Sequence, residues 1–369
     1  MSKITAEKKF QLAPGEGVIG ILGGGQLGRM MAIAAANMGY QTHIFSPDED
    51  SPAFDVATFY TRAAYDDRKA LAEFAQKVAV ITIEFENIPL DSAEYLAQHT
   101  PFFPPPAAIG ITQDRAAEKS FINGLDISTA PWRAVEELQQ IPSYISELGD
   151  KAIIKTRRFG YDGKGQWLIS PEKPLDMPLL QQELADIPVI IEGFCPFTKE
   201  ISVIVSRFQD GRVCCYPVTE NEHKNHILSV SRSPANISSR LAEIATESAI
   251  SIAEALNYVG ILAVEMFVTP DHRIVVNELA PRPHNSGHWT MDAAPCSQFE
   301  QHIRAICGLP AGAVYPCQTA EMVNIIGDDV TNWRNFLEKP HCHLHLYGKK
   351  EARSGRKMGH ATTIIERGK

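Results

Sequence analysis

The chain has 369 residues, 44% of them hydrophobic, and a formal net charge of −9 at pH 7. Its length suits two or three domains, its acidic balance argues against nucleic-acid binding, and no apolar run approaches the ~20 residues of a membrane span. The start, MSKITAEKKFQLAPGEG, has no apolar signal core, and the seven cysteines include no C-x-x-C pair, which suits reduced thiols. A cytoplasmic protein without a membrane partner is therefore expected.

The first part of the chain alternates strands, turns and helices, which predicts a parallel sheet covered by helices. The predicted strands are Val18–Leu22, Gln41–Phe45 and Val78–Ile83. The predicted helices are Met30–Met38 and Asp66–Gln76. A proline cluster, Pro101 and Pro104 to Pro106, then predicts a linker or domain boundary.

A glycine-rich turn, Gly23-x-Gly25-x-x-Gly28, joins the first strand to the first helix. This is the dinucleotide-binding fingerprint, and Asp48 lies 20 residues beyond Gly28, so a NAD-dependent oxidoreductase is one alternative. The motif itself explains only a tight turn and a positive helix end, where any phosphate or carboxylate can sit. Gln26, at the helix start, is a candidate ligand contact. Cofactor binding here is the weaker hypothesis, because phosphate-binding features are richer later in the chain.

Beyond the prolines the pattern predicts a mainly antiparallel sheet. The predicted strands are Ala152–Lys155, Val189–Glu192, Glu200–Ser206, Arg212–Tyr216, Ile261–Phe267 and Arg273–Asn277, the last two joined by a turn at Thr269–His272. The predicted helices are Asp114–Phe121, Leu241–Leu256 and Ser297–Ile306. Thr219–His226 is predicted as a polar loop, and Cys317–Tyr347 with the basic end as a small β-rich third piece.

The two strands of the last hairpin each carry one carboxylate, Glu265 inside AVEMF and Glu278 at the end of VVNEL. A Glu among aliphatic residues is costly to bury unless an ion or a partner compensates it. Two of them on neighbouring strands suit a hard cation such as Mg²⁺. The alternative is a pair of salt-bridged glutamates beside an ordinary loop, but the polar run from Arg282 to His288 that follows makes this less attractive.

The stretch Lys155–Gln166 has the residue types of a phosphate-binding flap. Lys155 closes an apolar strand, where an ammonium needs an anion, and the glycines that follow let backbone N–H groups approach phosphate oxygens. The pattern predicts a flexible flap that carries Lys164 over a triphosphate. The alternative is a solvated basic turn, which Tyr161 and Asp162 between the glycines make less attractive.

The next apolar strand ends in Glu192 and a loop, which would offer backbone groups to an adenine edge. Glu200 is a candidate acceptor for ribose hydroxyls, and His223 is either a ligand or an exposed histidine.

Histidines also alternate near the end, at positions 341, 343 and 345, and so share one strand face. A zinc site would lack a fourth ligand, so an exposed face is predicted. From Lys349 to Lys369 there are seven Lys or Arg against two Glu, enough to serve a small anionic ligand.

Taken together, these residues resemble the ATP-grasp superfamily. Within it, GGGQLGRM, EFENIP, APRPHNSGHWT and GRKMGH are very similar to the family of ATP-dependent 5-(carboxyamino)imidazole ribonucleotide synthetases, the ATPase subunit of phosphoribosylaminoimidazole carboxylase. The resemblance runs from about Val18 to His360. It implies use of MgATP, with Mn²⁺ as an alternative metal, and bicarbonate to carboxylate the amine of 5-aminoimidazole ribonucleotide in purine biosynthesis.

The resemblance also implies the architecture, which is α/β and α+β: an ATP-grasp fold with an N-terminal parallel-sheet domain, pre-ATP-grasp and Rossmann-like, and a small β-rich C-terminal domain. The expected parts are a polar extension at residues 1–17, then domains at residues 18–110, 111–308 and 309–369. A homodimer is expected for the family. A formate-dependent ribonucleotide transformylase or a biotin carboxylase would share the ATP half but not HNSGHWT or GRKMGH. A nucleotide-sensing protein would need no bicarbonate site.

By resemblance, the ATP contacts are Arg115, Lys155, Gly160, Tyr161, Asp162, Gly163, Lys164, Gly165, Gln166, Glu192, Gly193, Phe194, Cys195, Glu200, His223, Asn277 and Glu278. Glu265 and Glu278 would hold the metal. The residues around bicarbonate and the nucleotide substrate would be Gln26, Glu84, Tyr161, Asp162, Arg282, His284, Asn285, Ser286, Arg356 and Lys357. Arg282 is the expected bicarbonate clamp, because a guanidinium fork matches a planar anion. His284, Tyr161 and Asp162 are the candidates for moving the amine proton.

Overall fold

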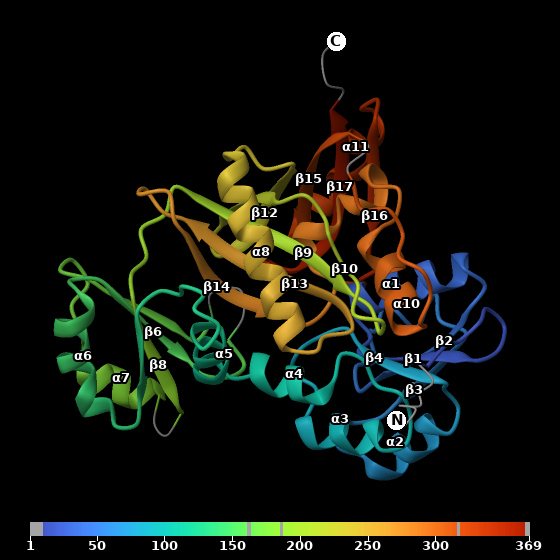
Figure 1. Cartoon of the computed structure of the whole chain (residues 1–369), viewed down its shortest axis with the longest axis horizontal. Coiled ribbons are helices and arrows are strands. Elements are labelled where there is room, and N and C mark those ends of the chain that lie inside the picture. Colours follow the sequence, from blue (N-terminus) through green and yellow to red (C-terminus); the bar gives the residue numbers. More distant parts are fainter. Residues whose placement is uncertain (1–9, 161–163, 185–186, 316–317, 366–369) are drawn as a thin grey trace, which may run out of the picture.

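The computed structural model describes residues 10–160, 164–184, 187–315 and 318–365. Within these ranges the chain forms three sheets with helices packed on them (Figure 1). Three predicted ligand residues, Tyr161, Asp162 and Gly163, lie outside the described residues. None of the described helices is long and apolar enough to cross a membrane.

The N-terminal sheet is parallel, with the strand order β3-β2-β1-β4. Its strands are β1 (Val18–Leu22), β2 (Gln41–Ser46), β3 (Phe59–Arg62) and β4 (Val80–Ile83), and its helices are α1 (Gln26–Asn37), α2 (Arg68–Ala75) and α3 (Leu90–Ala97). Side chains alternate between its faces, as a strand requires. Ile19 and Ile21 pack with α1, whereas Leu22 packs on the face of α2 and α3.

The proline cluster does not form an extended linker. Pro106 is the first residue of α4 (Pro106–Thr112), a position where proline is well tolerated because its missing N–H has no helical partner there. Helix α4 packs against α3 and against α5 (Arg115–Asn123), and thus connects the first sheet to the rest of the chain.

The second sheet is antiparallel, with the order β5-β8-β6-β7, and forms the lobe at the left of Figure 1. Its strands are β5 (Trp132–Val135), β6 (Ala152–Thr156), β7 (Gln166–Ile169) and β8 (Val189–Gly193). The helical elements of this lobe are η1 (Leu138–Gln140), α6 (Ile141–Leu148) and α7 (Met177–Leu184). A separate apolar core, including Ile141, Ile154 and Leu180, holds them together.

The third sheet has nine antiparallel strands among the described residues, in the order β14-β13-β9-β11-β12-β15-β17-β16 with β10 beside β9. Its strands are β9 (Lys199–Arg207), β10 (Val213–Cys215), β11 (Thr219–Lys224), β12 (Ile227–Ser233), β13 (Gly260–Val268), β14 (Ile274–Ala280), β15 (Thr319–Ile326), β16 (Cys342–Leu346) and β17 (Lys357–Ile365). The helical elements around it are α8 (Ser239–Ala255), η2 (Asn285–Gly287), α9 (Thr290–Ala293), α10 (Gln298–Ile306), η3 (Gly327–Asn332) and α11 (Trp333–Leu337).

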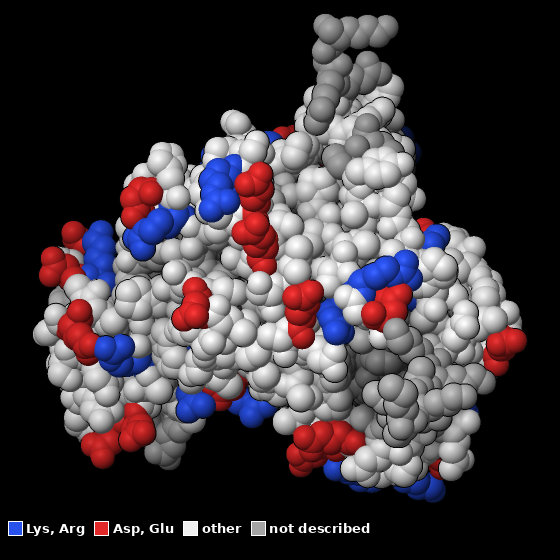
Figure 2. Space-filling view, in the orientation of Figure 1, with Lys and Arg blue, Asp and Glu red and all other residues white. Residues whose placement is uncertain are grey.

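Helix α8 covers one face of this sheet, where it packs on Leu262 and Val264. Trp289 and Ala293 cover the other face, against Ile261 and Ala263. Lys and Arg side chains are interspersed with Asp and Glu over the face of the molecule shown in Figure 2.

One feature of the third sheet differs from the sequence prediction. The predicted polar loop at Thr219–His226 is wrong, because Thr219–Lys224 forms strand β11 between β9 and β12. The C-terminal part is β-rich, as predicted, and its strands β15, β16 and β17 belong to the third sheet. Strand β15 pairs with β12, so the sheet runs without interruption into the C-terminal part of the chain.

Candidate functional site

The two predicted metal-binding carboxylates face one another. Glu265 of β13 and Glu278 of β14 are direct register partners in the antiparallel ladder, at a β-bulge. Their side chains are 16% and 39% exposed, so both keep access to a ligand. Their oxygen atoms are the donors that Mg²⁺ prefers, and the pair therefore fits the predicted ion.

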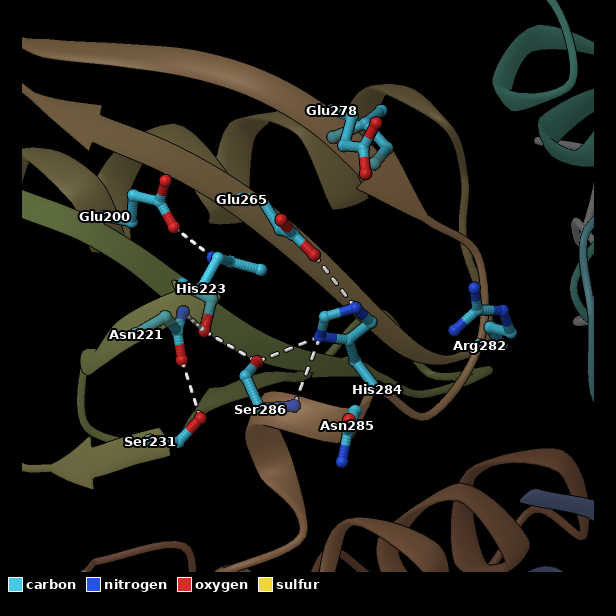
Figure 3. Close-up of polar contacts among 12 residues, drawn as sticks. Glu200, Asn221, His223, Ser231, Glu265, Glu278, Arg282, His284, Asn285 and Ser286 are labelled. Carbon is cyan, nitrogen blue, oxygen red and sulfur yellow. Dashed lines mark hydrogen bonds and ion pairs between the residues drawn. The ribbon is translucent and has the colours of Figure 1, made fainter. Parts of the chain in front are cut away.

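Glu265 also anchors a chain of hydrogen bonds that crosses the sheet (Figure 3). Its carboxylate lies 2.8 Å from Nε2 of His284, and Nδ1 of the same ring lies 2.9 Å from the Ser286 hydroxyl. The Ser286 hydroxyl lies 2.7 Å from the hydroxyl of Ser202 in β9, to which the amide of Asn221 in β11 donates a hydrogen bond at 3.0 Å. Burial alone would raise the pKa of Glu265, but the neighbouring His284 brings it below the ordinary value. The carboxylate is therefore ionised and the imidazole is held in one orientation.

Arg282, the predicted bicarbonate clamp, lies between the first and third sheets. Its Nε donates to the carboxylate of Glu86 at 2.6 Å, and its side chain is 18% exposed. Glu86 follows β4 in the EFENIP motif. Burial would raise the pKa of Glu86, but the guanidinium lowers it below the ordinary value. This ion pair fixes the plane of the guanidinium, and sequence reasoning missed Glu86.

The loop after β14 is held from inside by amide side chains. Gln298 of α10 accepts from the backbone N–H of His284 at 2.9 Å and donates to its carbonyl oxygen at 2.7 Å. Asn285 forms a reciprocal amide pair with Asn324 of β15, at 2.9 and 2.7 Å. Asn285 and Ser286 are buried and bonded to protein, and their predicted contact with the substrate stays a prediction. They support the loop.

A second charged network joins helix α5 to the second sheet. Lys155 of β6 and Lys119 of α5 both contact the Glu192 carboxylate, at 2.8 and 3.1 Å. Burial would raise the pKa of Glu192, but the two ammonium groups bring it down to about 2. From the same helix, Arg115 lies 2.9 Å from Glu278 of the carboxylate pair. The predicted ATP residues Arg115, Lys155 and Glu192 are thus linked through α5 to the carboxylate pair.

Sequence reasoning missed Glu118 and Lys119. Glu118 accepts from the backbone N–H of Leu279 at 2.9 Å, and burial and Glu278 raise its pKa to about 8. Both follow Asp114-Arg115 at a spacing of three or four residues, which places them on one side of a helix with Arg115. That spacing was the available signal. Asp114 is the N-cap of this helix, and its carboxylate also accepts hydrogen bonds from Nε and Nη2 of Arg157.

Glu200 of β9 and His223 of β11 form a further ion pair on the same face (Figure 3). Their side chains are 22% and 27% exposed. Burial would lower the pKa of His223, but its hydrogen bond to Glu200 raises it above the ordinary value. His223 is therefore a partner of Glu200 rather than an isolated exposed histidine.

The glycine-rich turn holds an internal carboxylate. Glu84, directly after β4, accepts from the backbone N–H of Gly25 at 2.5 Å and of Gly28 at 2.8 Å. Gly23 has φ 118°, and a Cβ there would lie 1.9 Å from the Glu84 side chain. The N-terminal end of α1 is therefore filled by the protein itself, which argues against a dinucleotide in this turn. Glu84 supports the turn, and Gln26 beside it is half-buried.

The basic end lies against the first sheet. Arg356 is 3.4 Å from Asp50, and Lys349 donates to the backbone carbonyl of Lys357 at 2.7 Å. Burial and neighbouring cations lower the pKa of Lys349 to about 8. The charge of Lys357 acts on both Glu265 and His223. Lys357 therefore contributes positive charge around Glu265, and Arg356 pairs with the loop after β2. Lys349 is a residue that sequence reasoning missed.

Of the glycine-rich segment Gly160–Gln166, the structure describes Gly160 and the residues from Lys164 to Gln166. Gly165 has φ 68°, and its carbonyl oxygen accepts from the backbone N–H of Thr156 at 2.9 Å. Its missing side chain allows a close approach to the Thr156 side chain. On the neighbouring strand end, Gly193 is buried, Phe194 is exposed and Cys195 is half-buried.

The predicted exposed histidine face is partly wrong. His341 precedes β16, and His343 is 49% exposed, but His345 is only 28% exposed and lies 3.0 Å from Asp292 of α9. Its ring stacks on His360 of β17.

Three family models match the chain: the ribonucleotide synthetase preATP-grasp domain at residues 17–113, the ATP-grasp domain at residues 120–299, and the phosphoribosylaminoimidazole carboxylase C-terminal domain at residues 320–368. These matches confirm the predicted fold class.

Relatives and solved structures that are named as synthases or synthetases of N5-carboxyaminoimidazole ribonucleotide match over nearly the whole chain. The N5-carboxyaminoimidazole ribonucleotide synthase of Brucella melitensis biotype 1 is 48% identical over 359 residues, which cover 97% of this chain and 99% of the relative. The solved ADP complex of an N5-carboxyaminoimidazole ribonucleotide synthetase has a TM-score of 0.93 and 42% identity, covering 98% of this chain and 95% of that one. The Aspergillus clavatus synthase in complex with ADP and 5-aminoimidazole ribonucleotide has a TM-score of 0.88 and 30% identity, covering 94% and 93%. The chain therefore belongs to the N5-carboxyaminoimidazole ribonucleotide synthase family of ATP-grasp ligases.

Proposed function

We propose that the chain uses ATP and bicarbonate to carboxylate the amine of 5-aminoimidazole ribonucleotide, which gives N5-carboxyaminoimidazole ribonucleotide, ADP and phosphate. The observation that carries this proposal is the register-paired Glu265 and Glu278, with His284 bonded to the first and Arg282 fixed two residues before that histidine. The names of the relatives describe this product, and one relative was solved with ADP and 5-aminoimidazole ribonucleotide.

The reaction has two steps. A bicarbonate oxygen attacks the γ-phosphorus of ATP, the bond to ADP breaks, and carboxyphosphate forms. The amine then attacks the carbonyl carbon of carboxyphosphate, phosphate leaves, and the nitrogen loses a proton. Phosphoryl transfer depends on charge neutralisation and in-line positioning more than on covalent help from the protein.

The charges that ATP requires are supplied from several elements. We assign Glu265 and Glu278 to Mg²⁺, with Mn²⁺ as the alternative, and the bound ion would neutralise phosphate charge. Lys155 and Lys164 are assigned to the phosphate oxygens. Glu192 orients the Lys155 ammonium, and Lys119 balances the same carboxylate from α5 when Lys155 turns toward a phosphate.

Arg282 is assigned to bicarbonate. Its Nε is held by Glu86, so the guanidinium plane is set before the anion arrives, which favours two-point recognition of a planar carboxylate-like group. His284, oriented by Glu265 and Ser286, is assigned to the proton that the amine loses. Tyr161 and Asp162 remain sequence-based candidates for this role.

The domain limits expected from the sequence, residues 18–110, 111–308 and 309–369, are part of the same proposal, as are a homodimer and a cytoplasmic location. The dimer is testable by light scattering coupled to size-exclusion chromatography.

The test of the reaction measures ADP release with MgATP while bicarbonate and 5-aminoimidazole ribonucleotide are omitted one at a time. We expect rapid ADP formation only when both are present, with the carboxylated product detected by ¹³C NMR from labelled bicarbonate. Formate in place of bicarbonate is the matched control, since a formate-dependent transformylase shares the ATP half. ADP formation with formate and not with bicarbonate would contradict the proposal.

A further inference from the structure

A cluster of one aspartate and two histidines shares no residue with the ATP site described above. Asp292 of α9, His345 of β16 and His360 of β17 each offer one ligand atom, and these atoms lie within 4.8 Å of one another. His345 and His360 are register partners on neighbouring strands, with their rings stacked at a centroid distance of 4.7 Å. Three elements distant in sequence thus bring metal-binding groups to one point.

Two of the three groups that would bind an ion already contact one another. Nε2 of His345 lies 3.0 Å from both carboxylate oxygens of Asp292. The side chain of Asp292 is 8% exposed, and that of His345 is 28% exposed. Bonds of ~2.0–2.2 Å to one tetrahedral ion would place donor atoms roughly 3.3–3.6 Å apart. The ligand atoms therefore need to approach one another only modestly, while the stacked rings must turn so that both nitrogens point at the ion.

One of these histidines carries a buried nitrogen that nothing satisfies within the described part of the chain. His360 is fully buried, with 0% exposure, and its Nδ1 lies 2.9 Å from the Tyr347 hydroxyl. Its Nε2 is buried and has no hydrogen-bond partner among the described residues. An unsatisfied buried polar group is destabilising, and a bound cation would satisfy this nitrogen. His288, whose ring lies 4.8 Å from that of His360, has a similar unpaired Nε2 within the same described ranges.

We propose that Asp292, His345 and His360 form a binding site for a transition-metal ion of the Zn²⁺ class. Two imidazole nitrogens and one carboxylate suit Zn²⁺, Co²⁺ or Ni²⁺, whereas Mg²⁺ prefers oxygen donors alone. Tyr347 completes the arrangement as an outer partner. Its contact with Nδ1 fixes the ring orientation of His360 and leaves Nε2 for the ion.

The location gives such an ion a structural consequence. Helix α9 continues the loop that carries Arg282 and His284, whereas β17 begins at Lys357. An ion held by Asp292 and His360 therefore clamps the loop of the ATP-grasp part to the strand that presents the basic end. Three protein ligands leave one position for water, and no chemistry on substrate is assigned to it.

The first test is a titration of the full-length, tag-free protein with Co²⁺, followed by visible absorption in the presence of saturating MgADP. The MgADP occupies the carboxylate pair, so the titration reports other sites. We expect intense d–d bands that saturate at one equivalent and are lost when Zn²⁺ is added. The absence of such bands, or saturation only at several equivalents, would overturn the proposal without any variant.

Variants then identify the ligands. Asp292→Asn keeps the shape of the side chain, and His345→Gln replaces a partly exposed side chain. Each should raise the apparent Kd for Co²⁺ at least about tenfold, since even residues that only support a metal ligand typically contribute 10- to 100-fold in affinity. Tyr347→Phe should weaken binding by roughly tenfold. The matched control is His343→Gln, 3.9 Å from Asp292 and 49% exposed, which should bind as the wild type does. Unchanged binding in Asp292→Asn, or a loss confined to His343→Gln, would refute the assignment.

Discussion

Replacing Glu265 by glutamine tests the carboxylate pair most directly. The amide keeps the shape of the side chain and can still accept the His284 hydrogen bond, now 2.8 Å long. What it removes is one negative charge opposite Glu278 in the ladder. The fold should therefore persist while affinity for the metal falls.

The size of the effect follows from the interaction lost. A hydrogen bond or ion contact that involves a charged group is worth about 1.5–3 kcal/mol. At about 1.4 kcal/mol per factor of ten, kcat/KM should fall roughly 10- to 150-fold. The free energy of unfolding should change by less than about 1.5 kcal/mol, because no cavity and no unpaired group is created.

The assay is coupled ADP formation at a series of Mg²⁺ concentrations, with thermal melting on the same samples. Higher Mg²⁺ should restore part of the activity, because the defect lies in ion affinity. Glu243→Gln is the control, since Glu243 is 62% exposed and pairs only with Arg240 on α8 among the described residues. Full activity of Glu265→Gln at ordinary Mg²⁺ would mean that this carboxylate is only a partner of His284, and the ion assignment would be refuted.

Three substitutions probe binding and backbone. Arg282→Lys should leave ATP binding intact but raise KM for bicarbonate strongly, because lysine keeps the charge and loses the planar fork; unchanged bicarbonate kinetics would exclude the clamp. Lys357→Met should raise KM for 5-aminoimidazole ribonucleotide roughly ten- to a hundredfold and leave KM for ATP nearly constant. An equal rise of both KM values would contradict the assignment of this lysine to 5-aminoimidazole ribonucleotide. Gly23→Ala should lower the melting temperature markedly, because its Cβ would lie 1.9 Å from the Glu84 side chain. A fourth concerns pH: burial raises the folded pKa of Glu118 to about 8, so the folded state holds a proton that the unfolded state releases from about pH 4.5 upward. The free energy of unfolding therefore falls as the pH rises from about 4.5 to 8, because of this carboxyl group. In urea unfolding, Glu118→Gln should lose less stability over that interval than the wild type does. Plots of unfolding free energy against pH that run parallel for the two proteins would contradict the raised pKa.

Elements with a regular apolar pattern could be predicted from the sequence. Strand β1 has the predicted bounds, and the β13–β14 hairpin forms with its turn at Thr269–His272, because alternation and turn residues are local signals. Strand β11 escaped prediction for a physical reason. Its inward residues include Asn221, which is buried by hydrogen bonds to Ser202 and Ser231 rather than by apolar contacts, so the sequence carries no hydrophobic alternation there.

The candidate site, too, could be predicted from the sequence only in part. Residue types pointed correctly to the pairing of Glu265 with Glu278, since both lie on one predicted hairpin. The partners that orient the site come from far along the chain, and residue type alone does not reveal them. Arg282 is held by Glu86, 196 residues away in sequence, and Glu84 fills a turn 56 residues before it. The amide pair of Asn285 with Asn324, 39 residues away in sequence, is a further contact that residue type alone does not reveal.

The uninterrupted third sheet has a consequence for how the chain can be shortened. Strand β12 is an interior strand only because β15 pairs with it from Val230 to Ser233. A chain ended before Thr319 would turn β12 into an open edge with unpaired N–H and C=O groups, a template for pairing with other chains. Glu265 and Glu278 would still be encoded, yet the product should self-associate. The C-terminal strands thus serve as a cap against aggregation, in addition to presenting the basic end.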